Sequence, residues 1–219
     1  MVTIDTAARP SLATVLVVSV AAFLASLDLF IVNIAFPELR SAFATNDFGA
    51  MSWVLNAYTV VFAAFLTPAG RLGDRYGHRR IFLAGLAVFV AGSLACGLSP
   101  TLPVLIAARV TQALGAAMLM PSSLAMLMGA VPEHRRTAAI STWSAVGAMA
   151  AALGPPIGGL LVEIDWRWIF LVNLPLGLAA LVAGPVVLTK TTTQGTGVPD
   201  LFGALSNEAM ATCCSTLAI

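Results

Sequence analysis

Six long apolar segments, separated by short polar stretches, constrain this chain more than any other feature. We place these segments at about 12–36, 53–72, 81–98, 102–131, 138–162 and 169–188. A helix of about 20 residues is long enough to cross the hydrocarbon core of a bilayer. Only 10% of the residues are charged, against roughly 25% in a soluble domain. The sequence therefore predicts an all-α membrane protein with six transmembrane helices between residues 12 and 188.

The flanking residues and the remaining composition exclude several other classes of function. Residues 1–11 are interpreted as a cytoplasmic lead, and residues 189–219 as a divergent, disordered cytoplasmic tail. His78 and His134 lie in loops without metal-ligand spacing, and we expect both to be solvated. Without a P-loop or an arranged nucleophile, no enzyme activity, metal or cofactor is expected. A net charge of +1 argues against nucleic acid as a partner.

A short basic hairpin at residues 70–80 sets the predicted orientation in the membrane. It holds four of the eleven Lys and Arg residues, and its glycines allow a tight reversal. Asp74 can cap the next helix or pair with a neighbouring arginine. Short basic loops stay in the cytoplasm, so we expect both termini there, in a plasma (inner) membrane. The other Lys and Arg residues follow this orientation: Arg9, Arg135, Arg136 and Lys190 fall inside, and Arg40 and Arg167 outside.

Two charged residues, Asp28 and Arg109, lie within the apolar segments. Each is seven or eight residues from the outer end of its segment, or about 10–12 Å deep at ~1.5 Å per residue. Equal depth is what a pair, or two sides of one cavity, requires. Asp28 can change its charge whereas Arg109 cannot, so the two form a candidate proton switch. Alternatively, each side chain snorkels or binds a backbone carbonyl.

Two further segments carry periodic patterns. Gln112 lies on the same helix face as Arg109, which predicts either a polar cavity wall or a packed polar patch. The fifth segment has two stripes of small residues that would let a neighbouring helix approach closely. Packing explains these stripes as well as gating does. The first stripe is Gly147, Ala151, Gly154 and Gly158, and the second is Ala148, Ala152, Pro155 and Gly159.

Six stretches resemble the motifs of one transporter family. They are residues 27–37, 53–58, 70–80, 109–121, 147–159 and 166–177. Residues 70–80 and 109–121 resemble loop and fourth-helix motifs of the major facilitator superfamily, and 147–159 resembles the fifth-helix motif of its antiporters. Residues 27–37 are similar to the first-helix motif of its drug:proton antiporters, and 53–58 and 166–177 are similar to motifs of the fourteen-helix branch of those exporters. Together these resemblances cover about residues 12–188.

The resemblance implies a multidrug or antibiotic exporter that exchanges a drug-like organic compound, cationic compounds included, for protons. It assigns proton coupling to Asp28 and Arg109, and the cavity or substrate to Asn33 and Gln112. A charge clamp between helices is implied for Gly70, Asp74, Arg75, Gly77, Arg79 and Arg80. Helix packing that sets the direction of transport is implied for Gly147, Gly154, Pro155, Gly158 and Gly159.

The family transports by rocking two six-helix halves around a central site, and this chain resembles the N-terminal half. Three interpretations stay open. The chain belongs to an active exporter, it is a truncated half that is inactive or docks on a partner membrane protein, or it forms a transporting homo-oligomer. The exported compound is not predicted, because such a cavity is lined by both halves.

Overall fold

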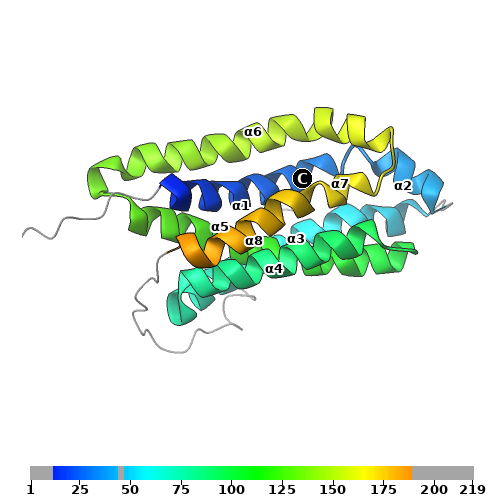
Figure 1. Ribbon diagram of the computed structural model, residues 1–219. Coiled ribbons are helices and arrows are strands. Elements are labelled where there is room, and N and C mark those ends of the chain that lie inside the picture. Colours follow the sequence, from blue (N-terminus) through cyan, green and yellow to red (C-terminus); the bar gives the residue numbers. More distant parts are fainter. Residues whose placement is uncertain (1–11, 44–46, 189–219) are drawn as a thin grey trace, which may run out of the picture.

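The computed structural model describes residues 12–43 and 47–188, and it is helical almost throughout. The helices are α1 (Leu12–Ile31), α2 (Phe36–Ala42), α3 (Phe48–Tyr76), α4 (His78–Gly97), α5 (Leu102–Ala130), η1 (Glu133–Arg135), α6 (Arg136–Val162), α7 (Trp168–Leu171) and α8 (Asn173–Val187). Six stretches within them are long and apolar enough to cross a membrane, with α7 and α8 together forming the sixth. These long helices lie side by side along one axis (Figure 1). The prediction of an all-α membrane fold with six spans is confirmed.

The connection between the first two spans differs in detail from its predicted form. The first predicted span continued to residue 36, but α1 ends at Ile31 and Pro37 lies in the first turn of α2. Proline suits that position because the first amides of a helix have no intrahelical acceptor. Asp47 then caps α3, since its Oδ1 accepts a hydrogen bond from Ala50 N at 3.0 Å.

A single residue, Gly77, separates α3 from α4. Its φ of 95° lies in the region that favours glycine, and its amide donates to the carbonyl of Gly73 at 2.8 Å. The predicted second span ended at residue 72 and the predicted third span began at residue 81, with most of the charged residues of this segment between them. Both helices instead continue through the charged residues, because backbone hydrogen bonds do not depend on apolar side chains. The predicted hairpin is therefore a one-residue reversal.

The sixth span is interrupted at Val172, between α7 and α8. Pro175 explains the interruption, because it has no N–H to donate to the carbonyl of Leu171 four residues earlier. The first full helical residue after the interruption is Asn173. The break therefore places a polar amide at the start of α8, inside the bundle.

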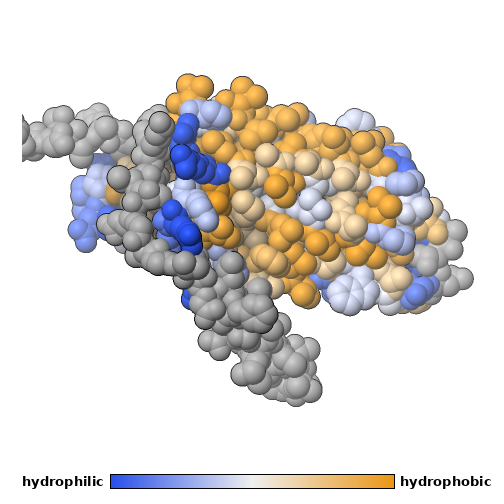
Figure 2. All heavy atoms as spheres, turned by 90° about the horizontal axis from the view of Figure 1, so that it is seen from below, coloured by the Kyte–Doolittle hydropathy of each residue, from blue (hydrophilic) through white to orange (hydrophobic). Residues whose placement is uncertain are grey.

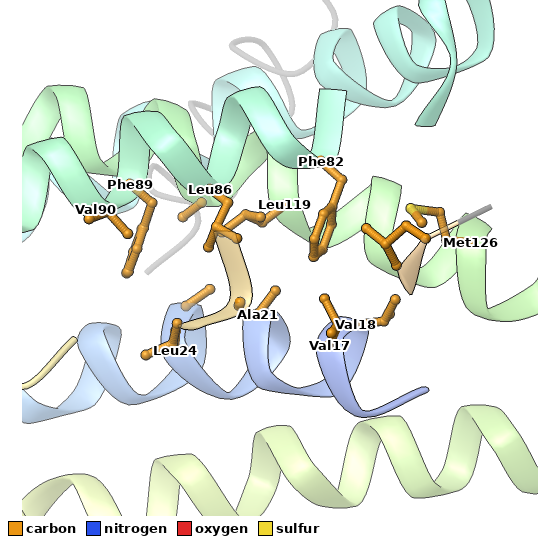
Figure 3. Close-up of a cluster of buried hydrophobic side chains, with 14 of the residues drawn as sticks. Val17, Val18, Ala21, Leu24, Phe82, Leu86, Phe89, Val90, Leu119 and Met126 are labelled. Carbon is orange, nitrogen blue, oxygen red and sulfur yellow. The ribbon is translucent and has the colours of Figure 1, made fainter. Parts of the chain in front are cut away.

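The largest apolar core lies between α1, α4 and α5 (Figure 3). Val18, Ala21 and Leu24 on α1 point toward Phe82 and Phe89 on α4. A second apolar cluster surrounds Ile31, Ile169 and Phe170, near the α1–α2 connection. On the face in Figure 2, hydrophobic residues cover the middle and strongly hydrophilic ones gather toward the ends. This distribution suits a bundle whose waist is surrounded by lipid.

Glycines bring α4 and α5 into direct backbone contact. A Cβ added at Gly92 would lie 2.7 Å from both N and Cα of Gln112. A Cβ at Gly115 would collide with the backbone of Phe89, and it would lie 2.7 Å from the carbonyl oxygen of Gly85. Real Cβ atoms do not approach backbone atoms this closely. The two helices therefore need glycine at these crossings, and the crossing at Gly92 fixes the place of Gln112.

Candidate functional site

A buried polar network lies between the two apolar clusters, and Asp28 and Arg109 form its centre. Asp28 on α1 and Arg109 on α5 are both essentially inaccessible to solvent. Nη1 of Arg109 donates to Oδ2 of Asp28 at 2.5 Å, which makes a charge-assisted hydrogen bond. The structure thus places in contact the two charged residues whose equal depth suggested a pair.

Gln112 connects this ion pair to α4. Its Nε2 donates to Oδ1 of Asp28 at 2.8 Å and to Oγ of Ser93 at 2.7 Å. Its Oε1 accepts from Nη1 of Arg109 at 2.8 Å. Sγ of Cys96 lies 3.6 Å from the same oxygen. Because both ends of the amide are engaged, the orientation of Gln112 is fixed.

Asn173 adds a contact from α8. Its Nδ2 donates to Oδ1 of Asp28 at 3.0 Å, across 145 residues of sequence. The Asp28 carboxylate therefore accepts hydrogen bonds from Arg109, Gln112 and Asn173. Four helices, α1, α4, α5 and α8, supply hydrogen-bonding side chains to one network.

Aromatic rings and a backbone carbonyl hold the Arg109 side chain. Its Nε donates to the carbonyl of Val54 on α3 at 3.2 Å. The guanidinium carbon lies 4.1 Å from the ring centroid of Tyr58 and 5.8 Å from that of Phe170, within cation–π range. Tyr58 OH in turn donates to the carbonyl of Ala25 at 3.4 Å. The cation is thus held by α3 and α7 as well as by Asp28.

Asn33, assigned to the cavity by resemblance, lies away from this network. It is exposed just beyond the end of α1, where its Nδ2 donates to the carbonyls of Leu29 and Phe30 at 3.1 and 3.3 Å. Here the amide serves the last turn of its own helix. Its role toward a substrate stays a prediction.

We expected Asp74 to cap the following helix or to pair with a neighbouring arginine, but the structure shows other contacts for the charged residues of the 70–80 segment. Asp74 pairs with His78, whose Nε2 lies 3.0 Å from Oδ1 of Asp74. Nη2 of Arg79 donates to the carbonyl of Pro185 on α8 at 2.7 Å. The guanidinium of Arg75 lies 5.3 Å from the ring centroid of Tyr76. The Arg79 contact ties the start of α4 to the end of α8.

The prediction that His78 is a solvated loop residue was wrong. The residue begins α4, and its side chain is only 15% exposed. Its ring packs so closely over Gly73 that a Cβ there would collide with Nδ1. A Cβ added at Gly70 would lie 3.6 Å from Cβ of Pro121 on α5, an ordinary van der Waals distance, and Arg80 is exposed. A charge clamp in this segment stays a prediction.

Of the two small-residue stripes of α6, the first packs against α1. A Cβ at Gly154 or Gly158 would lie 3.0 Å from atoms of Phe30 or Ile31, and one at Gly147 would lie 3.3 Å from Ser26. The second stripe faces elsewhere: Pro155 is exposed, and a Cβ at Gly159 would meet nothing within 4 Å. Sequence periodicity could not rank two equivalent stripes. Their role in the direction of transport stays a prediction.

Two members of the network, Ser93 and Asn173, were not assigned roles from the sequence. The available signal was a polar side chain inside an apolar segment, which for Asn173 is a strong one. Among residues 12–43 and 47–188, no cluster of three His, Cys, Asp or Glu residues could hold a metal ion. The described network combines one acid that can change its charge, Asp28, with the permanently charged Arg109 and the neutral amides of Gln112 and Asn173.

Comparisons with known proteins define the class to which this fold belongs. The model of the Major Facilitator Superfamily matches residues 18–211. A solved structure of the proton:xylose symporter XylE matches with a TM-score of 0.72 at 13% identity, covering 80% of this chain and 44% of that one. This chain belongs to the Major Facilitator Superfamily and is a multi-pass protein of a membrane-transporter family.

Relatives at higher identity carry the names of resistance and export proteins. The multidrug resistance protein Stp of Mycobacterium tuberculosis is 42% identical over 90% of this chain and 37% of its own length. The tetracenomycin C resistance and export protein of Streptomyces glaucescens is 42% identical over 80% of this chain and 33% of its own. The methylenomycin A resistance protein of Bacillus subtilis is 36% identical, over 85% and 40% respectively. The chain thus spans two fifths or less of each relative.

Proposed function

We propose that this chain forms the N-terminal half of an exporter that exchanges a drug-like organic compound for protons. The names of the relatives support export of such compounds. The observation that carries the coupling is the Asp28 carboxylate, fully buried between helices and bonded to a cation that cannot give up its proton. An ionisable residue at such a depth is expensive to maintain, which favours a functional role.

The proposed cycle alternates the charge of Asp28. Protonation from the outside would neutralise the carboxylate and weaken its attraction to Arg109, so the helices that carry them would be held less firmly. Release of that proton to the cytoplasm would restore the ion pair. The compound would bind between this half and a second one, which is either the rest of a longer chain or another copy.

The test is uptake of a cationic dye into inside-out vesicles that contain the chain, either alone or together with the C-terminal half of a longer relative. With a pH gradient applied, Asp28→Asn is expected to reduce dye transport to the level of vesicles without the protein, because asparagine cannot exchange a proton. Equal transport by both forms would contradict coupling through Asp28.

The arm without a second half tests the alternative interpretations. Transport by the chain alone would support a homo-oligomer. Transport only with the added C-terminal half would support a half that docks on a partner. If neither arm transports dye while both proteins are in the membrane, the chain is an inactive half.

We further propose that the end of the bundle holding Arg71, Arg75, Arg79 and Arg136 faces the cytoplasm. These residues surround the α3–α4 and α5–α6 connections, which lie at one end of the bundle (Figure 1), and basic connections are retained inside. In a chain whose three native cysteines are replaced by serine, a membrane-impermeant maleimide is expected to label Arg167→Cys in intact cells, but Arg136→Cys only after permeabilisation. The reverse pattern would contradict this orientation.

A further inference from the structure

Asn173 has an unusual combination of contacts for a fully buried residue. Its Nδ2 donates to Asp28 at 3.0 Å, while its Oδ1 has no hydrogen-bond partner in the described part of the chain. Leaving a buried amide oxygen unpaired costs on the order of 1–3 kcal/mol. A second state of the network, in which this oxygen is used, would explain why the amide lies here.

Protonation of Asp28 creates a need for such an acceptor. As a carboxylate, Asp28 only accepts hydrogen bonds, but as a carboxylic acid it also carries an O–H donor. Arg109 has no acceptor atom. The Gln112 oxygen already accepts from Arg109 at 2.8 Å, and turning that amide would place its NH₂ against the guanidinium. The amide oxygen that is left beside Asp28 is Oδ1 of Asn173.

The Asn173 side chain can exchange its two ends without disturbing the packing. The oxygen and the NH₂ group of an amide have nearly the same shape, and the torsion that exchanges them is broad and roughly two-fold. No hydrogen bond holds Oδ1 among the described residues, so a half-turn breaks only the bond from Nδ2 to Asp28. Gln112, by contrast, would lose contacts to three residues.

We propose that Asn173 is a positioning residue for the proton step at Asp28, donating to its carboxylate and, after a half-turn of the amide, accepting from its protonated form. This inference rests on the proposed function. In the step, a hydronium ion transfers a proton to Oδ1 of Asp28 and leaves as water, and the new O–H donates to Oδ1 of Asn173. Oδ2 keeps its hydrogen bond from Arg109, and the net charge of the pair changes from zero to +1.

The groups around Asp28 make Asn173 the adaptable partner. The charged or titratable side chains that interact with Asp28 in the described structure are Arg109 on α5, Tyr58 on α3 and Cys96 on α4. The hydroxyl of Tyr58 donates to Ala25, and Cys96 contacts Gln112. Asn173, on α8, brings a neutral amide. It keeps the Asp28 carboxyl group hydrogen-bonded in both charge states.

Infrared difference spectra of the 219-residue chain in lipid nanodiscs, recorded between acidic and neutral pH, test this proposal. The C=O stretch of a protonated Asp28 is identified by its loss in Asp28→Asn. Asn173→Leu is expected to move this band to higher frequency, because the O–H then lacks its acceptor. Asn56→Leu, at an exposed asparagine of α3, is the matched control and is expected to leave the band in place.

The outcomes separate the two proposals. A band with the same frequency in the wild type and in Asn173→Leu would overturn the role of Asn173 alone. A wild type without an Asp28 band would overturn Asp28 as the proton site, and the role of Asn173 with it. Should Asn173→Leu fail to fold, the second measurement uses wild-type protein whose asparagines carry ¹³C at the side-chain carbonyl carbon. A pH-dependent shift of an asparagine C=O band is then expected, and its absence would overturn the proposal.

Discussion

Arg109→Leu is expected to destabilise the bundle by about 3–5 kcal/mol, the usual cost of removing one member of a buried ion pair. The variant leaves the Asp28 carboxylate buried with only the two amide donors, from Gln112 and Asn173. It also removes the cation over Tyr58 and the bond to the Val54 carbonyl. The measurement is the free energy of unfolding in mixed micelles with increasing sodium dodecyl sulfate.

A double-mutant cycle with Asp28→Asn isolates the ion pair. Replacing both charges leaves no uncompensated charge in the core, so the double variant is expected to lose less stability than the two single losses combined. Additive losses would show that the pair contributes no coupling energy. Arg167→Leu is the control, because its partner Asp165 is 3.7 Å away and both side chains are more than two-fifths exposed. Such a pair contributes about 0–1 kcal/mol.

Gly92→Ala is expected to cost about 1–3 kcal/mol, the usual effect of overpacking a close contact. The added methyl group would lie 2.7 Å from backbone atoms of Gln112, which cannot rotate away as a side chain can. α4 and α5 must separate, and the bond from Gln112 to Ser93 would lengthen. Dye transport is therefore expected to fall together with stability.

Gly129→Ala on α5 is the matched control for this substitution. A methyl group at Gly129 would meet nothing within 4 Å. Alanine is also the better helix former, so no loss of stability is expected. Equal losses in Gly92→Ala and Gly129→Ala would show that helix contact at Gly92 does not matter.

Hydropathy predicted the spans well because an apolar run of membrane length has few other ways to fold. It placed their ends less well. The run of apolar residues stops at Leu72, yet α3 continues to Tyr76, since helical hydrogen bonds extend through charged residues until Gly77. At the start, α3 begins at Phe48, where the Asp47 cap decides the boundary.

The site was predictable as far as charge revealed it. Asp28 and Arg109 are distinctive because ionisable residues are rare within spans, and equal depth suggested that they meet. Asn173 is neutral and 145 residues from Asp28, so only the packing of α8 against α1 brings them together. The choice between the two stripes of α6 likewise depends on how α1 packs, which is not encoded in periodicity.

The separation of 81 residues between Asp28 and Arg109 also bears on how the protein is made. Translation at about 5–20 residues per second places Asp28 in the growing chain roughly 4–16 s before Arg109. During that interval α1 has to enter the bilayer while its acid lacks the cation that later holds it. The first span is therefore inserted with this acid uncharged or in contact with water, and the ion pair closes only when the fourth span arrives.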